Sequence, residues 1–307
     1  MATTTDTSRV EQEYRFLDGR PALFSPRWMR ELGWRHLVGV VAVVFAAFPI
    51  VYIVSASLSA VGSLQAANRL FSSVTGTNYE QLFDSPLHPF GNWFVNSMVI
   101  AVATAIGTVL LGAAAAYAFS RFRFRGRRAG LLSLLLIQMF PQLLAYVAIF
   151  LLLLSLEQVF PAIGRDTQLG LIMVYLGGAL GVNTYLMYGF FNTVPKELDE
   201  AAMIDGATHS QIFFTMILRL TAPILAVVAL LSFIATFNDF LIASVLLTTP
   251  KNQTLAVGLY GFINDQHAQN WGVFAAGAVL AAIPVVLLFQ FLQRFIVSGL
   301  TAGSVKG

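Results

Sequence analysis

The 307-residue sequence has no cysteine and only four histidines, and just 11% of its residues are charged. The lack of cysteine excludes disulfides, thiolate metal sites and cysteine nucleophiles. The histidines form no HxxH or HExxH pattern, so no metal site is expected. Soluble domains typically carry about 25% charged residues, whereas 57% of this chain is hydrophobic. The composition therefore predicts a lipid-embedded protein, and its small net charge of +3 indicates no nucleic-acid partner.

Long apolar runs predict the membrane-spanning segments. A bilayer core requires about 20 mostly apolar residues per helix. The runs are continuous rather than alternating, which favours helices over barrel strands. The predicted fold is therefore an all-α integral membrane protein with six transmembrane helices, at 37–58, 93–119, 130–156, 169–191, 221–247 and 273–297. Pro49, Pro141 and Pro284 lie inside these spans, where lipid-embedded helices tolerate kinks.

The distribution of basic residues predicts the orientation. With six spans both termini lie on one side, and fifteen of the eighteen Lys and Arg residues fall on that side. Positive-inside bias then places the termini and the polar segment 195–218 in the cytoplasm. Five of these arginines form the cluster RFRFRGRR at 121–128, which we interpret as a topology anchor rather than a site for anionic lipid.

This topology divides the chain into four parts. Residues 1–35 are too polar for a cleaved signal and are expected to form a cytoplasmic tail. The first helix and an extracytoplasmic loop then occupy 36–92. A transmembrane core at 93–297 and a cytoplasmic C-terminal tail at 298–307 complete the chain.

The stretch ELDEAAMIDGATHSQ at 197–211 is unusually acidic for this chain. It predicts two short helices joined at Gly206, a residue that readily takes a positive φ angle. Thr208 and Gln211 fit a capping box at the start of the second helix. One interpretation is a connector lying on the membrane surface, and another is a docking site for a protein. The acidic start favours the protein partner, because interfacial helices usually have a basic polar face.

The same stretch carries a family resemblance. EAAMIDGA followed by MILRLTAP resembles the EAA signature of bacterial ABC-importer permeases, which Glu200, Ala201, Ala202 and Gly206 match. Arg219 stands where that signature usually has proline. QMFP, YLGG, LAVGLYGF and GLTAGSVKG, in this order, resemble the second, six-span permease subunit of maltose/maltodextrin transporters. The chain is thus identified as a member of the binding-protein-dependent carbohydrate family of ABC-importer inner-membrane permeases.

The resemblance implies a type I ABC-importer permease fold in a bacterial inner membrane. Segment 195–218 would be the cytoplasmic coupling helix that docks on an ATPase through Glu200, Ala201, Ala202, Asp205 and Gly206, while Lys306 in the tail would lie near the same subunit. The implied partners are a second homologous permease, two copies of an ABC ATPase, an extracytoplasmic sugar-binding protein and membrane lipid. ATP and Mg would bind the ATPase, so this chain needs no cofactor. Because it has no GxxxxGK[ST] motif, the chain is expected to be non-catalytic.

A sugar path requires polar and aromatic side chains inside the bundle. One predicted stripe joins Gln138, Gln142 and Tyr146, and Asn183, Tyr188 and Asp239 add further candidates. Asp239 continues a stripe with Ser232 and Thr236. Hydrogen bonding between helices uses the same residue types and is the alternative interpretation. A carboxylate at mid-span costs about 3 kcal/mol on insertion scales, so Asp239 is expected to face protein or water.

Two other classes of function are weighed against this one. An ion-gradient-driven secondary transporter would have inverted repeats and several buried ionisable groups, neither of which is evident. An integral-membrane enzyme would require a catalytic constellation, and the sequence has no GxSxG or paired-carboxylate pattern. Within the importer class, maltose or maltodextrin is the first expectation for the sugar and a trehalose-like α-glucoside the next.

Overall fold

The computed structural model describes residues 25–60, 70–264 and 270–304, apart from the side chains of residues 27, 31, 142 and 296–304. The chain divides into two compact units, Met1–Ile53 and Val54–Gly307, and each is considered by itself. The first unit contains α2 (Pro26–Trp28), η1 (Met29–Gly33) and most of α3 (Trp34–Ser57). Most side chains along α3 are exposed and apolar, which suits a helix surrounded by lipid.

Every regular element of the second unit within the described residues is a helix, which confirms the predicted all-α class. Its elements are α4 (Thr77–Asp84), α5 (Phe90–Arg121), α6 (Arg127–Gln138), α7 (Gln142–Glu157), η3 (Pro161–Ile163), α8 (Gln168–Phe191), α9 (Glu197–Ile204), α10 (His209–Gln211), η4 (Ile212–Ile217), α11 (Leu218–Leu220), α12 (Ala222–Phe237), α13 (Leu241–Leu246), η5 (Pro250–Asn252), α14 (Leu255–Asn264) and α15 (Trp271–Ser304).

Four of the six predicted spans are confirmed as long apolar helices. Within the described residues, α3, α5, α8 and α15 are each long and apolar enough to cross a membrane. They correspond to the predictions at 37–58, 93–119, 169–191 and 273–297. Two further candidates are bent helix pairs, Arg127–Gln138 with Leu143–Glu157 and His209–Leu220 with Ala222–Phe237, and counting each as one span gives up to six. The second pair includes part of the segment 195–218, so its bounds differ from the prediction at 221–247.

The prediction of a continuous third span is wrong. Instead of one helix over 130–156, α6 and α7 meet at an angle of 100°. The turn lies at Phe140 and Pro141, between the end of α6 and the start of α7. Pro141 has no N–H to continue the helical ladder, and its ring disfavours helical geometry at the preceding residue. What the sequence presented as a tolerated kink is therefore a right-angled corner.

The predicted fifth span, 221–247, is also interrupted. Helix α12 ends at Phe237, and a second short helix, α13, begins at Leu241. The Asp239 carboxylate lies in the gap and accepts hydrogen bonds from the backbone N–H groups of Ile242 and Ala243, both at 3.1 Å. A carboxylate that satisfies free N–H groups at a helix start stabilises a new N-terminus, so Asp239 supports the break.

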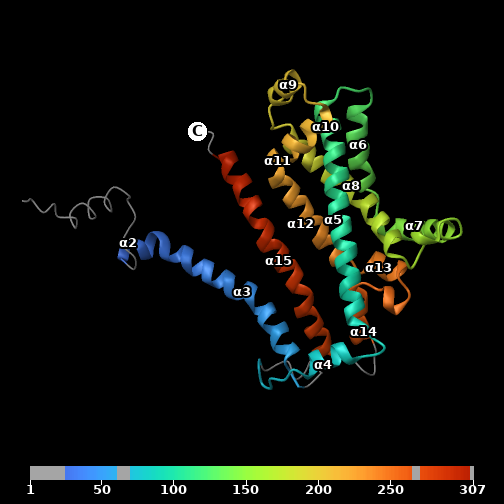
Figure 1. Ribbon diagram of the computed structural model, residues 1–307. Helices are drawn as coiled ribbons and strands as arrows, with labels where there is room; N and C mark the ends of the chain where they lie inside the picture. The colour runs from blue at the N-terminus through green and yellow to red at the C-terminus, as the bar shows by residue number, and fades with distance from the viewer. Residues whose placement is uncertain (1–24, 61–69, 265–269, 305–307) are drawn as a thin grey trace, which may run out of the picture. The chain divides into compact units, whose positions relative to one another are not determined.

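Helix α5 is central to the second unit, where it packs along α8 and α12, while α15 packs against α12. The helices α9 and α10 lie at one end of this unit, and α4 and α14 lie at the opposite end (Figure 1). One apolar core cluster, which includes Trp93 and Leu259, supports the α14 end. Another, which includes Tyr117 and Phe213, supports the α9 end. Each end of the bundle thus has its own apolar core cluster. The elbow of α9 and α10 lies at one end and the loop before α14 at the other.

Candidate functional site

The acidic segment forms the predicted helical elbow. Helix α9 ends at Ile204, and Gly206 follows with φ +85°, a left-handed conformation that confirms the predicted use of glycine. The predicted capping box is also present: the Thr208 side chain accepts a hydrogen bond from Gln211 N, and Gln211 Oε1 accepts one from Thr208 N. These contacts set the direction in which the chain leaves α9.

The outer face of α9 combines acidic groups with apolar ones. Of the predicted docking residues, Glu200, Ala201, Asp205 and Gly206 are exposed. Beside them Ile204 projects from the surface with 87% of its area exposed, a large fraction for an isoleucine. Leu198 and Met203 of the same helix are exposed as well, and patches of exposed apolar side chains are typical of surfaces that another protein covers. The sequence interpretation did not include Ile204.

The inner face of α9 contains one predicted docking residue and one residue to which the sequence analysis assigned no role. Ala202 packs against the core cluster of Tyr117 and Phe213, so of the two predicted alanines only Ala201 faces outward. Asp199 is buried and forms an ion pair with Arg121 at the end of α5. An acidic residue in the first turn stabilises a helix whichever way its side chain points. The presence of Asp199 there therefore does not indicate that it pairs with Arg121.

The second part of the elbow does not bury its apolar side chains in a regular α-helical stripe. Ile212, Phe213 and Ile217 are buried, whereas Leu220 is exposed. The reason is local geometry: Ile212–Ile217 form a π-helical segment, whose wider turns rotate the following side chains relative to an α-helix. The chain then bends by 79° into α12.

A cavity of about 1100 Å³ lies among α6, α7, α8, α12 and α13. Most of its walls are apolar, but polar side chains from four helices and the break after α12 converge on it. They include four of the predicted path residues, and the complete polar set among the described residues is Gln138, Tyr146, Tyr175, Asn183, Ser232, Thr236 and Asp239. The corner at Pro141 therefore does not separate Gln138 from Tyr146, since both still border the same space.

The hydrogen bonds of these residues show how firmly each is held. Gln138 Nε2 donates to the carbonyl of Gly178, and Asn183 Nδ2 donates to the carbonyl of Ala179 in its own helix. Tyr175 donates its hydroxyl hydrogen to Asp239 Oδ1 at 2.8 Å. The sequence interpretation missed Tyr175, although it lies in the YLGG motif. Its partner Asp239 is remote in sequence, and no helical stripe links the two.

The remaining predicted residues lie outside this cavity or outside the described structure. Tyr188 is absent from the cavity lining, and its hydroxyl accepts a hydrogen bond from Arg127 at 3.1 Å near the α9 end. The Gln142 side chain and all of Lys306 lie outside the described residues. Ser232 also donates a hydrogen bond to Thr108 at 3.2 Å, so this cavity residue packs between helices as well.

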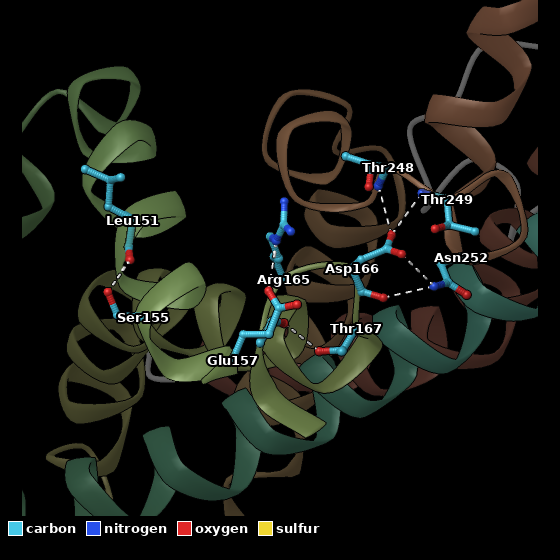
Figure 2. Close-up of polar contacts among 10 residues, drawn as sticks. Leu151, Ser155, Glu157, Arg165, Asp166, Thr167, Thr248, Thr249 and Asn252 are labelled. Atoms are coloured by element: carbon cyan, nitrogen blue, oxygen red, sulfur yellow. Dashed lines mark hydrogen bonds and ion pairs between the residues drawn. The ribbon is translucent and has the colours of Figure 1, made fainter. Parts of the chain in front are cut away.

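A second polar structure, centred on Asp166, holds the loop before α14. Figure 2 shows the Asp166 carboxylate accepting from the N–H groups of Thr248 and Thr249 and from the side chain of Asn252. Its backbone N–H and carbonyl also bind this loop, through Leu246 and Asn252 respectively. Asp166 takes a positive φ of 58°, so a non-glycine residue adopts a rare conformation here.

Two side chains of α5 hold the same loop from the other side. Trp93 Nε1 donates to the carbonyl of Pro250 at 2.7 Å, and Asn96 Nδ2 donates to the carbonyls of Lys251 and Gln253. Partial burial raises the pKa of the Asp166 carboxyl, but the hydrogen bonds from the loop outweigh this effect and hold the pKa below its ordinary value. The carboxylate is therefore charged at neutral pH.

The second unit thus combines long apolar helices, a partly open cavity with polar side chains in its lining and a helical elbow at one end. The chain belongs to the family described as binding-protein-dependent transport system inner membrane component, whose model matches residues 108–302. It is therefore a multi-pass membrane component of an ABC-type importer.

Named relatives and a solved structure agree with this assignment. The chain is 43% identical over 256 residues to the maltodextrin transport system permease protein MdxG of Bacillus subtilis, covering 83% of this chain and 89% of that protein. It is 40% identical over 282 residues to the galactooligosaccharides transport system permease protein GanQ of the same organism, covering 92% and 97%. A bacterial ABC transporter involved in the import of the acidic polysaccharide alginate matches with TM-score 0.72 and 26% identity, covering 90% and 99%.

Proposed function

We propose that this chain is a permease subunit of an ATP-driven, binding-protein-dependent sugar importer and forms half of the translocation path. The second half comes from a homologous permease subunit. The observation that carries the proposal is the elbow at 195–218, whose acidic outer face includes the projecting Ile204. This surface does not suit an anionic membrane, but it suits a groove on a protein partner. We assign that groove to an ATPase subunit.

In this assembly the α9 end faces the cytoplasm. The exposed arginines Arg123 and Arg125 lie in the turn after α5, and Arg128 lies at the start of α6. This is the end where Arg121 contacts α9, which supports the orientation by the positive-inside rule. Two copies of the ATPase bind ATP and Mg there, so the chain itself is non-catalytic. Lys306 in the tail lies near the same subunit. The binding protein delivers sugar from the extracytoplasmic side of a bacterial inner membrane.

The cavity is our proposed share of the sugar path. Tyrosine rings suit the faces of sugar rings, and the amides and hydroxyls suit sugar hydroxyl groups. Asp239 is the one charged residue among the described lining residues. The names of the relatives favour maltose, maltodextrin or a similar α-glucoside as cargo. Sugar-stimulated ATP hydrolysis by the reconstituted transporter, screened with maltose, maltotriose, trehalose and a galactooligosaccharide, identifies the substrate.

The docking assignment is tested with a bulky side chain on the outer face of α9. Ala201→Trp should abolish co-purification of the ATPase while leaving membrane insertion and pairing with the second permease intact. Ala162→Trp is the matched control, because Ala162 is equally an exposed alanine in a short helix, η3, but lies outside the elbow. If both variants retain the ATPase, the elbow is a surface connector and the proposal fails.

A further inference from the structure

The ion pair between Arg121 and Asp199 joins the end of α5 to the first turn of α9. The Arg121 Nε and Asp199 Oδ2 atoms are 2.6 Å apart, and only 5% and 9% of the two side chains are exposed. The same guanidinium donates from an Nη atom to the carbonyl of Val194 at 3.1 Å, just before α9. Arg121 therefore contacts both α9 and the loop that leads into it.

The surroundings of this pair are apolar and close-packed. Tyr117, Val194 and Phe213 belong to one buried core cluster, and Ala202 of α9 packs against it. Within the described part of the chain, the buried atoms Asp199 Oδ1 and Arg121 Nη1 have no hydrogen-bond partner. A buried pair with unsatisfied atoms contributes little net stability, and apolar side chains of similar volume are often at least as stable in such a place. Stability alone therefore does not account for the pair.

We propose that the Arg121–Asp199 pair is the joint through which movement of α9 is transmitted to α5. An ionic contact in a low-dielectric interior is electrostatically stronger than in water, and separating its two charges is costly because each would be left buried and unpaired. Helix α5 extends from this joint to Trp93, which binds the loop before α14 at the opposite end of the bundle. The joint thus connects the elbow to a helix that reaches both ends.

This inference rests on the proposed function, because it takes α9 as the part that the ATPase moves. Arg121 and Asp199 are positioning residues in this scheme and touch neither nucleotide nor sugar. The two ideas fail separately. Loss of the docking proposal shows as retained ATPase in Ala201→Trp, whereas loss of the joint shows only in the coupling of an intact complex.

The experiment measures ATP hydrolysis of the full transporter in proteoliposomes, with and without its sugar-loaded binding protein, using the stimulating sugar from the screen. Asp199→Asn should retain the ATPase and basal hydrolysis but lower the stimulation ratio by about fivefold or more, the lower range of coupling between two sites. Asp199→Glu retains the charge and should restore most of the ratio. Glu157→Gln is the matched control, because Glu157 forms a 2.9 Å ion pair with Arg165 that is largely exposed.

A double variant separates coupling from stability. Arg121→Met with Asp199→Leu replaces the ion pair with apolar side chains and should still assemble, yet remain uncoupled. Parental stimulation in this double variant, or in Asp199→Asn, overturns the proposal. If the double variant does not assemble, the comparison of Asp199→Asn with Asp199→Glu decides alone: equal stimulation in both refutes the joint, and recovery only with glutamate supports it.

Discussion

Replacing Gly258 with alanine should destabilise the α14 end of the protein. A Cβ atom at Gly258 would lie 2.1 Å from Cδ2 of Trp93 and 2.3 Å from Cε3, far inside van der Waals contact. The Trp93 ring is 1% exposed and is held by its hydrogen bond to Pro250, so it has no free space to enter. The backbone of α14 must therefore move away from α5.

The expected cost follows from three effects. Overpacking a close-packed core typically costs about 1–3 kcal/mol. A shift of Trp93 that breaks its hydrogen bond to Pro250 adds about 1 kcal/mol. Alanine is favoured over glycine inside a helix by up to about 1 kcal/mol, which offsets part of the cost. The net loss should therefore be about 1–3 kcal/mol.

Thermal unfolding of the purified permease pair in detergent measures this change. Gly261→Ala is the matched control, because it is in the same helix and its nearest neighbour, the His88 ring, is 3.8 Å from the added Cβ. The control should be neutral or slightly stabilised. Equal melting temperatures for Gly258→Ala and Gly261→Ala would refute the packing argument.

The remaining predictions concern the elbow, the cavity, the loop clamp and the orientation. Gly206→Val should uncouple hydrolysis from uptake, since a left-handed conformation costs a β-branched residue about 1–2 kcal/mol, while Gly206→Asn should remain coupled because asparagine tolerates it. Asp239→Asn retains an acceptor for the start of α13 and should transport, whereas Asp239→Leu should lose uptake and stability; normal uptake by the leucine variant would contradict this role. Asp166 has a lowered pKa in the folded state, so its stabilisation is present above its ordinary pKa and is lost as the pH falls through the folded value. Parent protein should therefore unfold at a higher temperature than Asp166→Asn at pH 7, and the difference should shrink as the pH falls below the ordinary pKa of aspartate. A difference that stays constant with pH would show that the charge of the carboxylate is not its cause. In this cysteine-free chain, a membrane-impermeant maleimide should label Lys251→Cys from outside intact cells and Arg125→Cys only after lysis, and the reverse pattern would invert the orientation.

The long helices could be predicted from the sequence because lipid requires length and apolarity, and both are local properties. The corners could not be predicted from hydropathy. Pro141 indicates that the helix bends here, but the apolar content of the flanking segments is the same whether the bend is a slight kink or a right angle. Asp239 was recognised as unusual in a span, yet its role at the start of α13 depends on a helix break that the apolar run conceals.

The candidate sites were predictable to different degrees for the same reason. Gly206 and the capping box of Thr208 are local, and the structure confirms both. The Arg121–Asp199 pair joins residues that are remote in sequence, and each had a sufficient local explanation as a topology anchor or a helix-start acid. Tyr175 was likewise hidden, because its importance comes from Asp239 on another helix.

The left-handed conformation of Asp166 limits which amino acids this position accepts. Glycine would remove the conformational cost but would leave Thr248 and Thr249 without their acceptor. Glutamate has the carboxylate but not the tolerance for positive φ that short polar side chains have. Only aspartate and asparagine combine the required backbone freedom with an oxygen at the right reach. When a saturation library at this position is selected for growth on the transported sugar, only the variants with aspartate or asparagine should therefore be recovered.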